Sequence, residues 1–525
     1  MTSNSNEHYT VQEITREHAE SRAGRFDKTF SPRFEEHFPA LHSLFVQAYG
    51  DGEEGREPLT EAVSLAAQSW KDRPAALKRL DKQRADEPAW FASEQALGAV
   101  CDVERYAGSL KGLAKQVPYF QELGLTSLHL TSLFSVESGN REVNPSLGTT
   151  ADLTALVGKL RRAGISTAVE LSLAADATVN DLVGDALFLA NQGIEVLHLN
   201  GITAENRLAV QILNVLLHLA APSVLLASDA VDGGLTVNTA QMALTWEALA
   251  TRNARLLNQA LERHHELPES AAWITSVRDG DQIDWAFSDD DAAEFGVDGY
   301  WHRRFLNDFY TGAFQGSFAR GVAVRNDAES DATQVAGTTA SLAGVETGDP
   351  CGEDRVTLAY GLAMCTGGMP LIHLGDEVGQ LNDYYYVNRP AEAGDRRWIG
   401  RPRRQEEAYA VRSDTATMSG RIFARLTRLI EVRKNTAQFA GNALIPFHTG
   451  HEAVLGFQRP GATKKAKCVL VLANVSDHPV VVSAETLSGF APKAAELISG
   501  TKKSLDKGLE LPSHGLAWLE VSPRA

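Results

Sequence analysis

The sequence lacks the features that mark membrane, disulfide-rich and nucleic-acid-binding proteins. No apolar run approaches the ~20 residues that a membrane-spanning helix needs. The first thirty residues hold no apolar core of the secretory type, so we expect a cytoplasmic protein. The four cysteines form no CxxC motif and predict neither a disulfide framework nor a zinc site. A net charge of −17 argues against general binding of nucleic acid, which needs clustered Lys and Arg.

One formal nucleotide-binding motif is present, and its context argues against that function. Residues 50 to 55 spell GDGEEG, which matches GxGxxG. A dinucleotide-binding loop follows a strand, whereas this stretch follows a helix-like run and carries acidic side chains where a pyrophosphate would lie. We interpret residues 50 to 58 as a solvated loop. Asp289-Asp290-Asp291 and His264-His265 are interpreted as a helix start and a helix end, so we expect no cofactor and no metal.

Three patterns follow one another along the 525 residues and predict three domains. In residues 1–95, apolar residues at three- and four-residue spacing predict helices, for example over 34–49 and 59–80. In residues 96–440, short apolar runs alternate with amphipathic segments, which favours a (β/α)8 TIM barrel. Residues 441–525 contain short alternating runs split by Gly, Pro and Asn, which predict an antiparallel β-sandwich. The expected barrel strands include 127–130, 166–173, 194–199, 224–227, 273–277 and 371–374.

The barrel carries one insertion that is too long for an ordinary loop. It covers about residues 284–350, after the seventh strand, and is rich in Asp, Gly and aromatic residues. A small subdomain accounts for such a length.

Functional groups of a β/α barrel project from the carboxyl ends of its strands. In chain order, the polar or small residues at these ends are Ala174 and Ala175, His198 and Asn200, Asp229, Gly280 and Asp281, and Asp376 and Glu377. We therefore expect any site to be built from these positions.

Several segments resemble amylosucrases of the α-amylase clan (glycoside hydrolase family thirteen). They are 119–125 (YFQELGL), 128–130 (LHL), 143–149 (VNPSLGT), 273–285, 316–321 (GSFARG) and 367–379 (GGMPLIHLGDEVG). The resemblance runs from about residue 20 to the C-terminus and implies a helical N-terminal domain, a barrel, an insertion and a β domain. It also implies retaining glucosyl transfer from sucrose, with an Asp nucleophile on strand four, a Glu acid/base on strand five and a second Asp after strand seven.

Carried over onto this sequence, the resemblance places altered groups at the reacting positions. His198-Leu199-Asn200 stands where the family has Arg-x-Asp, and a neutral amide cannot form a glycosyl-enzyme. Asp229, one methylene shorter than Glu, stands at the acid/base position. Gly280 replaces a His. Of these positions, only Asp281 carries the residue type that the family has.

The groups that would hold the sugar are also altered. Ala174-Ala175 replaces the family's Asn-His pair, and the loop-three domain is nearly absent because a helix resumes by Val179. The resemblance leaves three catalytic positions, Asp281, Asp229 and the degenerate nucleophile position Asn200. It leaves five positions for contact with a substrate, His198, Arg278, Arg320, Asp376 and Glu377.

These departures predict an amylosucrase-like pseudoenzyme that is inactive in retaining glucosyl transfer. They affect the nucleophile, the acid/base and the groups that would hold the sugar, and such losses act together. It would bind a carbohydrate, an α-glucan or a sucrose-like ligand, or act as a regulatory partner in a homo-oligomer or in a hetero-oligomer with an active relative. The alternative is an active glucosyltransferase or glycoside hydrolase with a rearranged site, in which Asp229 and Asp281 serve as acid and base. A purely structural oligomer subunit is a third hypothesis.

Overall fold

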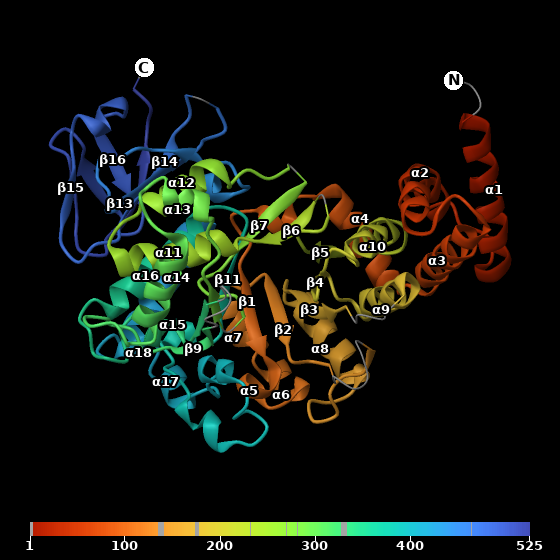
Figure 1. Cartoon of the computed structure of the whole chain (residues 1–525), viewed down its shortest axis with the longest axis horizontal. Helices are drawn as coiled ribbons and strands as arrows, with labels where there is room; N and C mark the ends of the chain where they lie inside the picture. Colours follow the sequence, from red (N-terminus) through yellow and green to blue (C-terminus); the bar gives the residue numbers. More distant parts are fainter. Residues whose placement is uncertain are drawn as a thin grey trace. The chain divides into compact units, whose positions relative to one another are not determined.

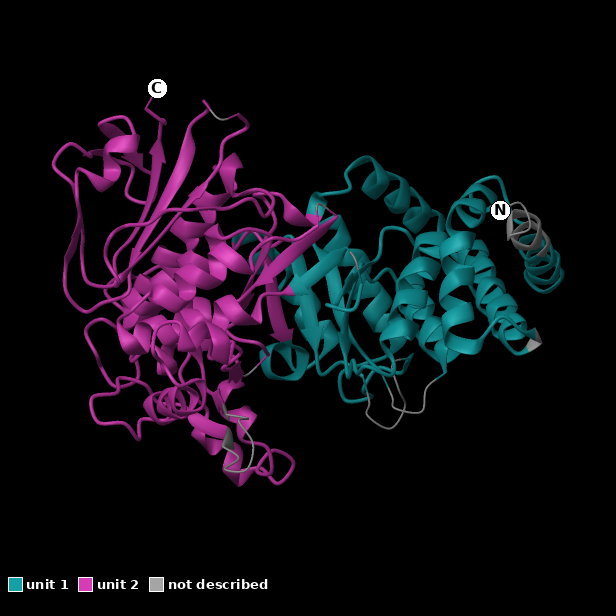
Figure 2. Ribbon diagram, turned by 45° about the horizontal axis from the view of Figure 1, so that its top comes forward, with its two compact units in different colours: residues 1–90, 102–122, 126–236 teal, residues 91–101, 123–125, 237–525 magenta. Residues whose placement is uncertain are grey.

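The structure is a computed structural model that describes residues 4–134, 141–173, 178–231, 233–268, 270–280, 282–326, 333–463 and 465–524. The chain divides into two compact units, coloured separately in Figure 2. Unit 1 comprises Met1–Trp90, Asp102–Glu122 and Thr126–Thr236, and unit 2 comprises Phe91–Cys101, Leu123–Leu125 and Val237–Ala525. None of the helices in the described ranges is long and apolar enough to cross a membrane.

Eight parallel strands form a closed barrel in the order β1-β11-β7-β6-β5-β4-β3-β2. All five residues of β11 are buried, as expected for parallel strands that are covered on both faces. The predicted TIM barrel is confirmed, although β1 and β6 were not among the expected strands. The strands are β1 (Gly98–Asp102), β2 (Ser127–Thr131), β3 (Ser166–Ser172), β4 (Val196–Asn200), β5 (Leu225–Ala227), β6 (Gly234–Val237), β7 (Ala271–Thr275) and β11 (Met369–His373).

Two barrel helices of unit 1, α8 and α9, begin at capping boxes. At the start of α8 (Thr150–Arg162), the Thr149 hydroxyl and the Asp152 carboxylate bond reciprocally to backbone N–H groups. Thr178 and Asp181 do the same at α9 (Val179–Gln192). Such capping boxes fix where each helix starts after the preceding strand. The remaining helices here are α5 (Val103–Ala107), α6 (Leu110–Lys115), α7 (Val117–Glu122) and α10 (Arg207–Ala220).

The N-terminal segment of unit 1 is helical, as expected, with two corrections. Its helices are α1 (Asn4–Ala23), α2 (Phe30–Tyr49), α3 (Glu53–Asp72) and α4 (Ala75–Asp86). The loop expected over 50–58 ends at residue 52, because Glu53 and Glu54 favour a helix N-terminus. The helix expected over 59–80 is broken at Pro74, which restricts the residue before it and favours a new start after it.

A buried ion pair anchors the junction between α3 and α4. The Arg73 guanidinium donates to both oxygens of Asp81 at 2.7 and 2.8 Å. Asp81 also accepts from the Ser223 hydroxyl at 2.6 Å, and Arg73 donates to the Ala190 carbonyl at 3.0 Å. The N-terminal helices are thereby joined to the end of α9 and to the segment that leads into β5.

Unit 2 adds the helices that cover β7 and β11, followed by the insertion. The longer helices are α11 (Thr239–Thr251), α12 (Arg255–Arg263), α16 (Gly352–Cys365) and α18 (Met418–Lys434). The insertion contains β8 (Gln282–Asp284), α13 (Asp289–Ala293), α14 (Gly299–Tyr310), β9 (Val322–Asn326), β10 (Thr333–Ala336) and α15 (Thr339–Leu342). Its strands form a sheet in the order β8-β10-β9. The three aspartates do begin a helix, capped by the Ser288 hydroxyl, and His264 does follow the end of α12.

The C-terminal β domain consists of two antiparallel sheets, drawn in blue in Figure 1. One has the order β12-β13-β14-β19-β16-β17 and the other pairs β15 with β18. Buried side chains from both sheets form one core, as in a sandwich, which confirms the expected architecture. The strands are β12 (Ile445–Pro446), β13 (Val454–Arg459), β14 (Cys468–Asn474), β15 (Val480–Val482), β16 (Lys493–Glu496), β17 (Thr501–Ser504), β18 (Leu509–Leu511) and β19 (Leu516–Val521).

Short helical turns complete unit 2. They are η1 (Trp90–Ala92), η3 (Asp376–Val378), η4 (Tyr384–Asn388), η5 (Arg396–Gly400), α17 (Glu406–Ala410), η6 (Ala437–Phe439) and η7 (Thr486–Gly489). Of these, η3 follows the carboxyl end of β11 and carries two of the expected site residues, Asp376 and Glu377.

Candidate functional site

Asn200 is the last residue of β4 and lies exposed at the carboxyl end of the strand. Its backbone carbonyl accepts a hydrogen bond from the Leu173 amide at 3.0 Å. Gly201 follows with φ of +80°, and a β-carbon there would lie 3.1 Å from the Leu173 carbonyl oxygen, so glycine suits this turn. The side chain at the expected nucleophile position is thus accessible and uncharged.

His198 lies two residues earlier on β4, and its ring stacks on that of His129 from β2. The ring centroids are 3.9 Å apart and the planes differ by 10°. Burial lowers the pKa of His198 to about 4, so the imidazole is neutral at pH 7. A neutral, stacked imidazole therefore occupies the place where the family pattern has a permanently charged Arg.

Two neighbours of His198 were not among the expected site residues. His129 is the third residue of β2, as His198 is the third of β4. Glu170 of β3 is paired in register with His198, which places both side chains on the same face of the sheet. Alternate strands of such a barrel contribute side chains to one interior layer. The two histidines hold the same position in the observed strands, but the expected fourth strand began at residue 194 and did not align them.

Asp229 lies beyond β5 and faces solvent, with 68% of its side chain exposed. One carboxylate oxygen is 3.8 Å from Nη1 of Arg207, and Nη2 of Arg207 donates to the Asp229 carbonyl at 2.6 Å. The buried residue at this strand end is Ser228, whose hydroxyl accepts from the Ala230 amide. A carboxylic acid that protonates a leaving group is normally held in a largely desolvated pocket. Asp229 lacks such surroundings.

In unit 2, Arg278 and Asp376 form a buried ion pair. Nη2 of Arg278 donates to the two oxygens of Asp376 at 3.1 and 3.2 Å. The carboxylate also accepts from the hydroxyls of Thr339, at 2.5 Å, and Tyr360, at 2.6 Å. Burial and the neighbouring Asp376 raise the pKa of Tyr360. Both charges are engaged by the protein itself, and their role in substrate contact stays a prediction.

Glu377 is fully buried beside this pair and is likewise engaged internally. One oxygen accepts from the Gly375 amide at 2.6 Å and the other from the Tyr409 hydroxyl at 3.0 Å. Arg320, in contrast, is exposed, and its backbone amide donates to the Ser341 carbonyl. Of the expected contact residues in unit 2, Arg320 is the accessible one.

The remaining predicted positions can be described only in part. Asp281, Ala174 and Ala175 lie outside the described residues. Gly280 is described and adopts φ of +58°, with no atom within 4 Å of a β-carbon built on it. A larger side chain there would meet backbone strain and no steric obstacle. Among the described residues, no group of three or more His, Cys, Asp or Glu side chains could hold a metal ion.

Comparison with known proteins bears on the fold. No family model matches the chain. The chain is similar to the crystal structure of AmyP in complex with maltose, with a TM-score of 0.61 and 11% identity over 84% of this chain and 99% of that one. It is also similar to a mutant isomaltulose synthase from Erwinia rhapontici NX5 in complex with D-glucose, with a TM-score of 0.54 and 10% identity over 83% and 99%.

A third similar structure is sucrose 6F-phosphate phosphorylase from Thermoanaerobacter thermosaccharolyticum. Its TM-score is 0.53 at 12% identity, over 73% of this chain and 94% of that one. At such identities the likeness concerns the fold alone. The chain has the fold of these α-amylase-clan enzymes, which confirms the structural part of the resemblance inferred from the sequence.

Proposed function

We propose that the protein is an amylosucrase-like pseudoenzyme that binds an α-glucan or a sucrose-like ligand and does not perform retaining glucosyl transfer. The observation that carries this proposal is Asn200, an exposed neutral amide at the end of β4. A retaining mechanism needs a carboxylate nucleophile there to form the covalent intermediate. An amide cannot supply it.

The surroundings of the other groups support the same proposal. Asp229 is open to water, and His198 is a neutral ring stacked on His129. The charges of Arg278 and Asp376 are neutralised within a buried network. None of these three arrangements offers a charge poised to change during glycosyl transfer.

The binding part of the proposal rests on the fold and on the exposed polar groups. AmyP was solved with maltose, and a variant of AmyP with maltotriose. In this chain the Asn200 amide and the Arg320 guanidinium are accessible. A neutral amide and a cation are suitable hydrogen-bond donors to sugar hydroxyls.

The catalytic half is tested by incubating the protein with sucrose and with maltodextrin and following glucose and fructose release. We expect no turnover above the uncatalysed rate. Turnover that Asp229→Ala or Asp281→Ala abolishes would instead establish an active enzyme with a rearranged site.

The combined variant Asn200→Asp, Asp229→Glu, His198→Arg and Gly280→His is the converse test. Because Asp229 faces solvent, we expect it to stay inactive.

The binding half is tested separately by calorimetry with maltoheptaose, with cellohexaose as the matched control. A glucan-binding role is supported if the protein binds maltoheptaose and not cellohexaose, and if Asn200→Leu or Arg320→Ala weakens that binding. No heat with either oligosaccharide contradicts that role and favours a regulatory or structural subunit.

A further inference from the structure

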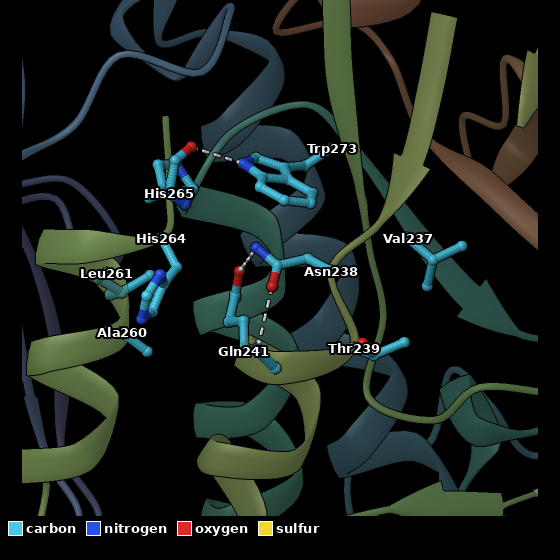
Figure 3. Close-up of a pocket in the computed structure, with 10 residues that line it drawn as sticks. Val237, Asn238, Thr239, Gln241, Ala260, Leu261, His264, His265 and Trp273 are labelled. Carbon is cyan, nitrogen blue, oxygen red and sulfur yellow. Dashed lines mark hydrogen bonds between the residues drawn. The ribbon is translucent and has the colours of Figure 1, made fainter. Parts of the chain in front are cut away.

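The polar groups around the cavity beside α11 and α12 are bonded within the protein. In Figure 3 the indole N–H of Trp273 donates to the His265 carbonyl at 2.8 Å. The Asn238 side chain accepts from the backbone amide of Gln241 and donates to its Oε1. The side chain of Asn200 differs from these, because no residue in the described ranges is hydrogen-bonded to it. It is an exposed and unengaged amide at the end of β4.

Asn200 is followed by Gly201, and this is the single Asn-Gly pair in the chain. An asparagine side chain loses ammonia when the backbone nitrogen of the next residue attacks its Cγ atom. The attack closes a five-membered imide ring. A following glycine favours this closure because it has no side chain to crowd the nitrogen. The local sequence therefore supplies both reactants of a deamidation.

The attacking nitrogen, that of Gly201, is accessible and unengaged. Backbone N–H groups inside a fold are nearly always paired, and pairing holds their protons in place. The N–H of Gly201 has no acceptor among the residues that the structure describes. Gly201 is exposed in the turn after β4, so its nitrogen can lose its proton to the solvent.

The peptide that joins Asn200 to Gly201 is weakly held. The extended backbone of a strand keeps the side chain away from the next nitrogen, so this peptide must rotate before the ring closes. Its carbonyl accepts one hydrogen bond, from the Leu173 amide at 3.0 Å, and the pairing of β4 with β5 ends at His198. The loss of one backbone hydrogen bond slows the closure by about tenfold or less and does not prevent it.

The far side of the turn is anchored separately. The side-chain amide of Asn206 donates to the Gly201 carbonyl at 2.8 Å. Gly201 itself has φ of +80° and no side chain that would resist a change of conformation. The rotation is therefore confined to a single peptide and leaves the start of α10 in place.

We propose that Asn200 is a deamidation site, at which the neutral amide at the end of β4 becomes a carboxylate without the action of an enzyme. The Gly201 nitrogen bonds to Cγ of Asn200, the bond from Cγ to Nδ2 breaks, and Nδ2 leaves as ammonia with the proton that the Gly201 nitrogen lost. Water then opens the imide. Opening at Cγ gives an aspartyl side chain, and opening at the backbone carbonyl gives an isoaspartyl linkage.

Either product adds one negative charge to the carboxyl end of β4. The modification itself does not rest on the proposed function, but its consequence does. A carboxylate only accepts hydrogen bonds, whereas the Asn200 amide also donates them. We expect the modified chain to bind maltoheptaose less tightly than the unmodified chain. The exposed Asp229 still offers no acid, so the new carboxylate does not restore glucosyl transfer.

The test is mass spectrometry of peptides from the full chain after incubation at pH 8 and 37 °C. We expect Asn200 to gain the mass by which OH exceeds NH2, at a rate within about tenfold of that of a synthetic peptide of residues 196–205. The rate should fall at pH 6, because the attack needs a deprotonated nitrogen. Asn200→Gln is the matched control, since it keeps the amide and would need a larger ring.

Asn435 is an internal reference in the same sample. It is exposed, but its side-chain amide donates to the Glu431 carbonyl at 2.8 Å and the next residue is the β-branched Thr436. We expect its mass to stay unchanged. Conversion of Asn435 as fast as that of Asn200 would overturn the inference, because the end of β4 would then have no particular reactivity.

The inference also fails if Asn200 keeps its mass in the folded chain over the time in which the synthetic peptide converts. Ion exchange separates the modified chain by its added charge for the binding measurement. If neither form binds maltoheptaose while the mass gain is present, the proposed function fails and the modification stands. The two failures are therefore distinguishable.

Discussion

At the scale of single residues, His198 shows how burial decides the charge of a side chain. The imidazole stacks on His129 and is held neutral, since desolvation disfavours the protonated form. The unfolded chain has no such restriction and protonates this side chain near pH 6.5. Folding stability therefore depends on pH through this residue.

We expect His198→Phe to flatten that dependence. As pH falls from 6.5 towards 4, the unfolded wild-type chain takes up a proton at His198 and the folded chain does not, so the free energy of unfolding decreases. The loss attributable to this residue is at most about 3 kcal/mol. Urea unfolding at pH 7 and pH 4.5 measures it. The control His448→Phe, at an exposed side chain, should keep the wild-type pH dependence. Parallel curves for wild type and His198→Phe would contradict the assignment.

At the scale of elements, a buried arginine joins the β domain to its neighbours within unit 2. Arg459 of β13 donates to the Thr366 carbonyl at the end of α16, and to the carbonyls of Gln438, Ala440 and Gly441. Burial lowers the pKa of Arg459 to about 10, which still leaves it charged at pH 7. The planar guanidinium group of Arg459 holds its N–H donors in a fixed geometry, so it can bond to several backbone carbonyls at once.

Arg459→Lys is expected to lower the free energy of unfolding by roughly 2–4 kcal/mol. A lysine ammonium cannot reach all four carbonyls, and buried acceptors left unbonded are costly. Chemical denaturation measures the change. Arg425→Lys is the matched control, because the Arg425–Asp354 pair is partly exposed and should change stability by about 0.5 kcal/mol or less. Equal effects of the two substitutions would show that the carbonyl contacts of Arg459 contribute little.

At the scale of the whole molecule, the N-terminal helices belong to the same compact unit as β2 to β5. Helix α10 packs against α2, α3 and α9, and the Arg73–Asp81 pair bonds to Ser223 and Ala190. The predicted boundaries, 1–95, 96–440 and 441–525, remain predictions. The packing within unit 1 implies that the first of these segments is not a removable module.

A chain that begins at residue 91 is therefore expected to aggregate. Deletion of residues 1–90 exposes the apolar surface of α10 that α2 and α3 cover. Size-exclusion chromatography and circular dichroism would report the loss of folded monomer or defined oligomer. A chain that begins at residue 11 is the control, because it retains the buried Thr15 and Ala19 of α1. A folded, monodisperse product from residue 91 onwards would instead support a domain boundary near residue 95.

Much of the fold was predictable because strand and helix periodicity is local in sequence. The apolar runs at 127–130 and 166–173 coincide with β2 and β3. β6 escaped prediction because it is short and begins at Gly234, which carries no side chain to mark a strand. The break at Pro74 and the early start of α3 were available in the sequence, since proline and acidic N-terminal residues are local signals.

The sequence by itself determined that this protein has a parallel barrel and that an amide stands at the end of its fourth strand. Residue identity and periodicity are encoded along the chain, and they suffice for both conclusions. Only the tertiary structure decided that His198 stacks on His129, that Asp229 faces water and that Asp376 is bonded to Tyr360 and Thr339. These outcomes depend on contacts between residues far apart in sequence, where packing sets burial, charge and accessibility.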